Sequence, residues 1–227
     1  MLDACGRSSG LRPEGGRRGG LQPAGRTRGC AAVNARPSVL VVTGPSGAGK
    51  GTLIHELLDR VPDLEVTVSA TTRDLRPGEA DGREYWFLTP EEFLARIEAG
   101  AFLEHVEYVS GHRYGTLRSE LARIRANRHI PLLELETEGA LRVKEEDPQA
   151  VTVFISAPVD ELERRLHERA TESTGEIGER IALAHEQLKQ AGDFDYVVAN
   201  DDLDRAAAEL TEIVSGLLDG AGTMTRP

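Results

Sequence analysis

The pattern of apolar and polar residues predicts alternating strands and helices from residue 39 onward. Short aliphatic runs typical of buried strands lie at Val39–Thr43, Ile130–Glu136, Val151–Ser156 and Tyr196–Ala199. Apolar residues recur at helical spacing over Lys50–Val61 and near residues 138–147, 159–169 and 176–191. Short strands that alternate with helices favour a parallel sheet with flanking crossover helices, so the expected fold class is α/β.

Between about residues 65 and 115 the pattern changes, which indicates a small mixed α/β subdomain inserted into the parallel core. Strand-like pieces lie at Glu65–Ser69, Tyr85–Leu88 and Phe102–Val109, and a helix should begin at Pro90 and end at Gly100. Further along, the polar segment Arg169–Glu179 separates two helices. Its composition suits a mobile lid, as it would suit any exposed loop.

These patterns predict one domain over residues 37–220. The core of this domain comprises residues 37–68 and 117–220. The insert comprises about residues 69–116, and a helical lid is expected at about residues 165–180. Residues 1–36 are rich in Gly, Arg and Pro and lack aliphatic periodicity. They cannot bury enough surface to offset the entropy of ordering, so we predict disordered tails at 1–36 and 221–227.

The charge is unevenly distributed, because residues 1–37 hold seven Arg against Asp3 and Glu14, a local net charge of +5. The total is −11, so the other 190 residues carry −16. A basic tail suggests nucleic-acid contact or targeting, but this one has no aromatic residue and no apolar signal core. A solvated or over-extended N-terminus is the favoured interpretation, and no nucleic-acid partner is expected.

Several other classes are disfavoured by composition. No apolar run approaches the ~18 residues that a membrane helix needs, so no membrane partner is expected. Cys5 and Cys30 both lie in the tail, which fits a reducing, cytoplasmic setting. The histidines have no metal-ligand spacing. A monomer or small homo-oligomer is expected.

A glycine-rich loop follows the first predicted strand and opens the first predicted helix. Residues Gly44–Thr52 read GPSGAGKGT, so Gly44, Pro45, Ser46, Gly47, Ala48, Gly49, Lys50, Gly51 and Thr52 are the candidate ATP-binding residues. Glycines let backbone N–H groups wrap a polyphosphate, and the helix N-terminus adds partial positive charge. The usual hydroxyl position after the lysine holds Gly51, so Thr52 is only a candidate metal ligand, and no firm direct ligand is assigned.

A second cluster could hold a phosphorylated acceptor. Arg73 and Arg76 lie in a turn-rich stretch that leads to Tyr85, and guanidinium groups bind phosphate bidentately. Two nearby arginines alone would more often form a solvated surface. Guanine presents adjacent N1–H and N2–H donors, which require a fixed carboxylate, and Glu104 is the candidate.

Several motifs, in order, resemble the guanylate kinase family over residues 39–218, about four-fifths of the chain. They are GPSGAGKGT, the SATTR block of residues 69–87, GAFLEHVEY, RYGT, ELETEG and NDDLD. The resemblance implies a P-loop NTPase core and MgATP-dependent phosphorylation of GMP, and of dGMP, in purine nucleotide metabolism. ATP and GMP would be its substrates and Mg²⁺ its cofactor. Gly51, Glu138 and Ala170 depart from the commoner family pattern.

The resemblance also implies roles for individual residues. The GMP site would comprise Ser69, Arg73, Arg76, Glu79, Tyr85, Glu104, Tyr114, Thr116 and Glu136. The catalytic cations would be Lys50, Arg73, Arg169 and Arg180, and Arg169 and Asn200 would also contact ATP. Glu134 would order water around magnesium.

Two alternatives keep the same fold. In one, catalysis is lost and the acceptor pocket binds a phosphorylated peptide as an interaction module. In the other, the acceptor is a ribosyl phosphate. The intact loop with Lys50 disfavours the first. The second is disfavoured by the residues that suit GMP, which are Ser69, Arg76, Tyr85, Glu104 and Tyr114.

Overall fold

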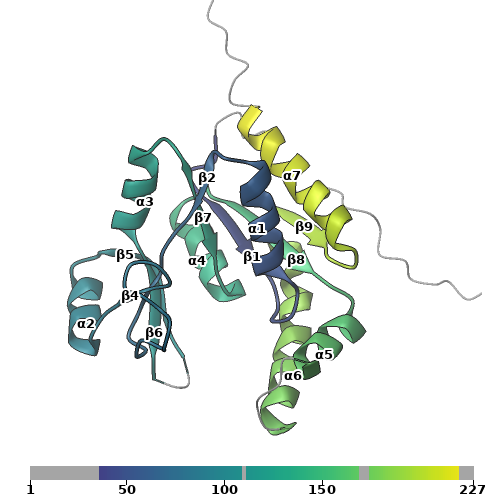
Figure 1. The fold of residues 1–227 in the computed structure, drawn as a ribbon, viewed down its shortest axis with the longest axis horizontal. Helices are drawn as coiled ribbons and strands as arrows, with labels where there is room; N and C mark the ends of the chain where they lie inside the picture. The colour runs from purple at the N-terminus through teal and green to yellow at the C-terminus, as the bar shows by residue number, and fades with distance from the viewer. Residues whose placement is uncertain (1–35, 109–110, 169–173, 220–227) are drawn as a thin grey trace, which may run out of the picture.

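The computed structural model of the protein describes residues 36–108, 111–168 and 174–219, and shows two sheets with surrounding helices (Figure 1). The tails predicted at 1–36 and 221–227 therefore lie outside the described residues, except for Arg36. In chain order the elements are β1 (Leu40–Thr43), α1 (Lys50–Arg60), β2 (Leu64–Val66), β3 (Ala70–Thr71), β4 (Trp86–Phe87), α2 (Pro90–Glu98), β5 (Phe102–Glu107), β6 (Arg113–Leu117), α3 (Arg118–Ala126), β7 (Ile130–Glu134), α4 (Thr137–Glu146), β8 (Val151–Ser156), α5 (Val159–Glu168), α6 (Thr174–Lys189), the 3₁₀ helix η1 (Gln190–Asp193), β9 (Tyr196–Ala199) and α7 (Leu203–Asp219).

The larger sheet has five parallel strands in the order β2-β7-β1-β8-β9. The central strand β1 pairs with β7 on one side and β8 on the other, so Leu40 lies opposite both Leu132 and Val151. Because all five strands are parallel, their carboxyl ends meet at one edge. The α/β class predicted from the alternating pattern is confirmed.

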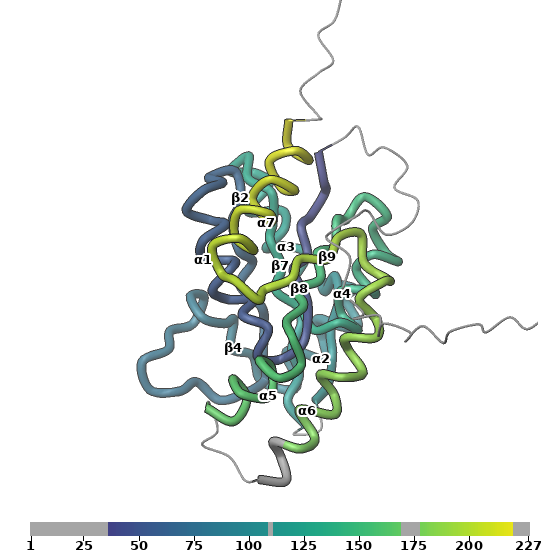
Figure 2. Tube along the Cα trace, turned by 90° about the vertical axis from the view of Figure 1, so that its right-hand side faces the viewer, coloured from purple at the N-terminus to yellow at the C-terminus, as the bar shows by residue number. Residues whose placement is uncertain are grey.

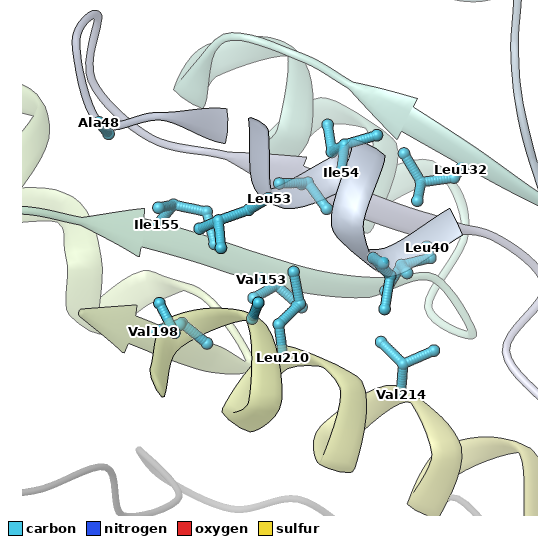
Figure 3. Close-up of a cluster of buried hydrophobic side chains, with 14 of the residues drawn as sticks. Leu40, Ala48, Leu53, Ile54, Leu132, Val153, Ile155, Val198, Leu210 and Val214 are labelled. Carbon is cyan, nitrogen blue, oxygen red and sulfur yellow. The ribbon is translucent and has the colours of Figure 1, made fainter. Parts of the chain in front are cut away.

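Both faces of the parallel sheet are buried, which explains why β1 reads as a continuous aliphatic run. Leu40 and Val42 point to the face covered by α1 and α7, where they pack with residues such as Leu53 and Leu210 (Figure 3). Val41 points to the opposite face and packs against α4. Figure 2 shows α1 and α7 on one side of the strands and α4 and α6 on the other.

The smaller sheet is mixed, with the strand order β4-β3-β6-β5. Its apolar face is covered by α2, where Phe93 stacks on Phe102 with ring centroids 4.4 Å apart. Thr89 and Glu92 form a reciprocal capping box at the start of α2, which Pro90 opens. The helix therefore begins at Pro90, as the sequence predicts, and ends at Glu98, just before Gly100.

The structure corrects four expectations. The strand expected at Glu65–Ser69 is β2, which pairs with β7 in the parallel sheet because Leu64 belongs to the core under α1. Helices α3 and α7 were not predicted. The helix expected near residues 176–191 begins slightly earlier, at Thr174, so part of the polar segment Arg169–Glu179 belongs to α6. Within the described ranges, no helix is both long and apolar enough to cross a membrane.

Candidate active site

The glycine-rich loop has the backbone conformation that its glycines predict. Gly44, Gly47 and Gly49 have φ values of 140°, 85° and 85°, a region that L side chains rarely adopt. A Cβ atom on Gly44 would lie 2.2 Å from the carbonyl oxygen of Ile155, so only glycine fits between β1 and β8 there. The loop therefore has a backbone conformation that requires glycine at the carboxyl edge of the parallel sheet.

Lys50 is the first residue of α1, and its side chain folds back over the loop. The Nζ atom donates to the carbonyl oxygens of Gly44 at 2.8 Å and Pro45 at 3.3 Å. The ammonium group thus lies above the concave side of the loop, where polyphosphate would bind. Gly51 and Thr52 are exposed on the first turn of α1.

Two side chains from distant elements hold the loop by hydrogen bonds to its carbonyl oxygens. Asn200, which is 3% exposed after β9, donates from Nδ2 to the carbonyl oxygen of Ala48 at 2.7 Å. Arg165 on α5 donates to the carbonyl oxygen of Gly47 at 3.2 Å. Asn200 was a candidate ATP contact, whereas Arg165 was expected only as a basic residue of the lid at residues 165–180. Its position on α5 beneath the loop could be found only from tertiary structure.

Two of the four candidate catalytic cations, Arg169 and Arg180, belong to the segment around α6. Arg169 lies outside the described residues. Arg180 is exposed on α6, one of the helices that leave the parallel sheet near the loop.

An arginine and two tyrosines gather on the smaller sheet, where the acceptor phosphate is expected. The Arg73 guanidinium forms two hydrogen bonds with Glu79, of 3.0 and 2.9 Å, and lies 5.4 Å from the ring centroid of Tyr85. Tyr85 and Tyr114 meet edge to face at 5.8 Å. The backbone N–H of Arg76 also donates to Glu79 at 2.8 Å, while its side chain is exposed. The Arg73 guanidinium holds the pKa of Glu79 below its usual range.

Glu79 therefore organises this loop: its carboxylate receives both the Arg73 guanidinium and the backbone of Arg76. The two planar groups match bidentately, which fixes the orientation of Arg73. A phosphate could take the place of this carboxylate, because both present paired oxygen atoms.

Neighbouring residues Tyr85 and Trp86 point to opposite faces of the smaller sheet, as alternation in a strand requires. Tyr85 faces Arg73 and Tyr114, whereas Trp86 packs against the cluster of Ala70, Phe93 and Phe102. The tyrosine thus belongs to the candidate site and the tryptophan to the core.

A buried carboxylate lies on β5 at the position expected for base recognition. Glu104 is 7% exposed and accepts a hydrogen bond of 2.8 Å from the Thr116 hydroxyl on β6. Burial raises the pKa of Glu104, and the hydrogen bonds from Thr116 act in the opposite direction. A Cβ atom on Gly139 would lie 3.4 Å from Glu104 Oε2, so the first turn of α4 closely approaches this carboxylate.

Two further glutamates lie where β7 meets α4. Glu134 ends β7, and Glu136 is the N-cap residue of α4. The surrounding protein raises the pKa of Glu134, the Lys50 ammonium lowers it, and the charge of Glu136 raises it. Glu134 is thus within electrostatic range of both the loop lysine and Glu136. Ser69 is half-buried before β3, and its carbonyl oxygen accepts from the Trp86 N–H at 2.9 Å.

Tyr108 is a residue that the candidate list lacks. Its ring is 42% exposed at the end of β5 and meets Tyr114 edge to face at 5.1 Å. Desolvation and the charge of Glu136 raise the pKa of Tyr108 to about 12. The Tyr108 ring thus lies beside Tyr114, one of the residues expected at the acceptor site. Its place in the GAFLEHVEY motif was the available signal.

Comparisons with known proteins all identify the same family. Residues 36–217 match the family model described as guanylate kinase. The chain is 46% identical to a guanylate kinase of Rubrobacter xylanophilus over 186 residues, which cover 82% of this chain and 97% of that protein. It is 45% identical to a guanylate kinase of Symbiobacterium thermophilum over 177 residues, which cover 78% and 83%.

A solved structure supports the same assignment. The crystal structure of guanylate kinase from Anaplasma phagocytophilum superposes with a TM-score of 0.63 at 29% identity, covering 80% of this chain and 86% of that one. The family model spans most of the chain and the relatives are matched over most of their length. The chain therefore belongs to the guanylate kinase family.

Proposed function

We propose that the protein transfers the γ-phosphoryl group of ATP to GMP, and to dGMP, giving ADP and the guanosine diphosphate. The observation that supports this substrate is the buried Glu104 carboxylate, oriented by Thr116 beside the cluster of Arg73, Tyr85 and Tyr114. A buried carboxylate is costly unless paired, so a ligand with two adjacent N–H donors is well suited to this site. Guanine has that pair of donors.

The donor would bind along the loop. The backbone N–H groups between Gly44 and Lys50 would surround the β-phosphate, and Lys50 would exchange its two carbonyl contacts for phosphate oxygens. Asn200 and Arg165 would keep the loop in shape meanwhile, because they bind the carbonyl oxygens of Ala48 and Gly47.

Magnesium fits the oxygen groups at the same edge of the sheet. Among the described residues no cluster of three or more His, Cys, Asp or Glu side chains could hold a metal by itself, so the phosphates must supply part of its coordination. The exposed Thr52 hydroxyl and the Glu134 carboxylate would hold it, the latter through water. Bound there, Mg²⁺ would neutralise charge on the β- and γ-phosphates.

The acceptor phosphate would bind where Glu79 now engages Arg73. Arg73 and Arg76 supply the positive charge, and the Tyr85 and Tyr114 hydroxyls supply neutral donors. Guanine would lie between Ser69, Glu104, Thr116 and Glu136. In this arrangement Arg73 would bridge the acceptor phosphate and the transferred γ-phosphoryl group.

The transfer itself needs positioning and charge neutralisation rather than a protein nucleophile. Lys50 and Arg73 would stabilise the charge that spreads over the transferred group, joined by Arg169 and Arg180 when the segment at residues 165–180 closes. Closure excludes water, which would otherwise accept the phosphoryl group. We expect the enzyme to act in the cytoplasm as a monomer or small homo-oligomer.

The test is a coupled assay for ADP release with MgATP and GMP, dGMP, AMP, CMP, UMP or a ribosyl phosphate as acceptor. Turnover with GMP and dGMP, on the order of 1 to 100 s⁻¹, is expected. Turnover with the ribosyl phosphate instead would replace the proposed acceptor. Folded protein that turns over no acceptor but binds a phosphorylated peptide would indicate an interaction module.

A further inference from the structure

The side chain of Gln187 on α6 makes a contact that has no part in the function proposed above. Its side chain is 6% exposed, although glutamine is usually found on the surface. The Nε2 atom donates to Glu136 Oε2 at 3.0 Å. A buried amide that donates to a carboxylate across two elements fixes the orientation of both groups.

Glu136 needs such an anchor, because its local structure leaves the carboxylate unrestrained. It is the N-cap residue of α4, but its side chain makes no capping hydrogen bond. It lies two residues after Glu134, the last residue of β7, and it opens the helix whose first turn approaches Glu104. A flexible glutamate there would repel Glu134 and lose its orientation toward a base.

We propose that Gln187 is a positioning residue that holds the Glu136 carboxylate in place for the guanine base. The inference rests on the proposed function of Glu136. The amide occupies Oε2, which leaves Oε1 to accept from the substrate. An amide is also the appropriate group, because it donates to a carboxylate without adding negative charge beside Glu134.

The same contact links the base pocket to the helix that bears Arg180. Arg180 and Gln187 are seven positions apart, which places them two turns apart on one side of α6. The helix also contacts α5 through His185 and Glu163, 3.4 Å apart, and α5 supplies the Arg165 that holds the loop. Gln187 thus joins the base pocket to the elements around the donor.

The variant Gln187→Met keeps the length of the side chain and removes the donor. We expect the KM for GMP to rise about tenfold, as for loss of a hydrogen bond to a charged group, while the KM for ATP changes less than about twofold. IMP lacks the 2-amino group, so the preference for GMP over IMP should fall about fivefold. Lys189→Met is the matched control, since it removes an exposed hydrogen bond from the same helix.

A swapped pair separates positioning from folding. In Gln187→Glu the two carboxylates repel, so both the melting temperature and GMP affinity should fall. Adding Glu136→Gln restores a donor and an acceptor, so the double variant should recover the melting temperature but not the preference for GMP over IMP. Recovery of both would mean that neither the Glu136 charge nor its orientation by Gln187 serves the base, and would overturn the proposal.

Glu136→Gln alone distinguishes this proposal from the function on which it rests. If this variant raises the KM for GMP but Gln187→Met does not, the positioning role is wrong and the role of Glu136 stands. If Glu136→Gln leaves the KM for GMP and the preference over IMP unchanged, the proposed base contact itself is wrong.

Discussion

The donor loop and the acceptor site are built in different ways. The donor loop is nine consecutive residues, Gly44–Thr52, and its binding surface is mainly backbone, shaped by three glycines with positive φ. The acceptor site is assembled from side chains on β5, β6, the loop before β4 and the start of α4. A backbone site can be recognised in one stretch of sequence, whereas a side-chain site depends on how separate elements pack.

The difference also concerns electrostatics. At the loop, one cation, Lys50, rests on neutral carbonyl oxygens and can move to phosphate with no ionic bond to break. At the acceptor site, Arg73 is already paired with Glu79. On the proposed function, the acceptor phosphate would have to compete with this carboxylate for Arg73.

The largest expected effect is at the donor loop. Lys50→Met should lower kcat about 10³-fold, because it removes the loop's positive charge from the transferred phosphate. The melting temperature without nucleotide should hardly change, since only two hydrogen bonds to carbonyl oxygens are lost. Steady-state kinetics and thermal unfolding measure the two quantities. A fall of less than tenfold in kcat would show that the loop binds without contributing to catalysis.

Glu104→Gln should change selectivity rather than the chemical step. The variant keeps the shape but loses the charge, so the ratio of kcat/KM for GMP over AMP should fall about 100-fold. Because burial raises the pKa of Glu104, the wild-type carboxyl protonates at a higher pH than an exposed glutamate. The KM for GMP should therefore rise as the pH falls from 7 toward 5.

The glutamine variant supplies the control for that profile, since its KM for GMP should not follow the pH in this way. The sign for stability is opposite: a raised pKa in the folded state means that the ionised form costs stability at neutral pH. Protonation as the pH falls through the folded pKa recovers that cost. A wild-type KM that is flat over this range would contradict the assignment of Glu104.

Two glycines of the loop offer a matched pair with smaller effects. Gly49 has φ 85°, and a Cβ atom there would lie 2.4 Å from Asn200 Nδ2. Gly49→Ala should therefore cost about 1 to 3 kcal/mol of stability and raise the KM for ATP. Gly51 has no atom within 4 Å of such a Cβ and lies in α1, so Gly51→Ala should leave the melting temperature equal or slightly higher. Equal melting temperatures for the two variants would show that the loop relaxes around Gly49.

The smallest effect is expected in an ion-pair network beside the sheet. Glu65 on β2 bonds His129 at 3.0 Å and Arg123 at 2.6 Å, and the hydrogen bond with His129 is the largest cause of its lowered pKa. A lowered pKa contributes stability above the unfolded pKa, and this is lost as the pH falls through the folded pKa. Glu65→Gln should cost roughly 0.5 kcal/mol at pH 7, because its partners are largely solvated. The difference from wild type should vanish near pH 3 in thermal melts, with kcat unchanged at pH 7.

Much of the fold follows from local pattern. The aliphatic runs predicted β1, β7, β8 and β9, because strands buried on both faces leave continuous apolar segments. Helix α3 left little signal, since Leu121 and Ile124 are its main buried apolar residues and it follows β6 without a turn. Helix α7 had a signal in Ala206, Leu210 and Val214 that could have been read.

The sequence identified the candidate site residues that lie in a motif. It missed the residues that reach the site only through tertiary packing. Glu104 and Arg73 lie in recognisable motifs, and the structure brings them to one sheet with Tyr85, Tyr114 and Thr116. Arg165 and Gln187 act through contacts with residues 118 and 51 positions away. Sequence spacing carries no information on such contacts, because they depend on how α5 and α6 dock.

The hydrogen bond from Asn200 to Ala48 joins residues 152 positions apart. The nucleotide site can therefore be completed only late in the synthesis of the domain. The glycine-rich loop emerges early from the ribosome, but its rear support arrives only after β9 has been made and has paired with β8. Because long-range contacts form late, a nascent chain that ends before residue 200 should lack a fully formed nucleotide site. Competence to bind ATP is then acquired only after Asn200 has been made and β9 has docked on β8.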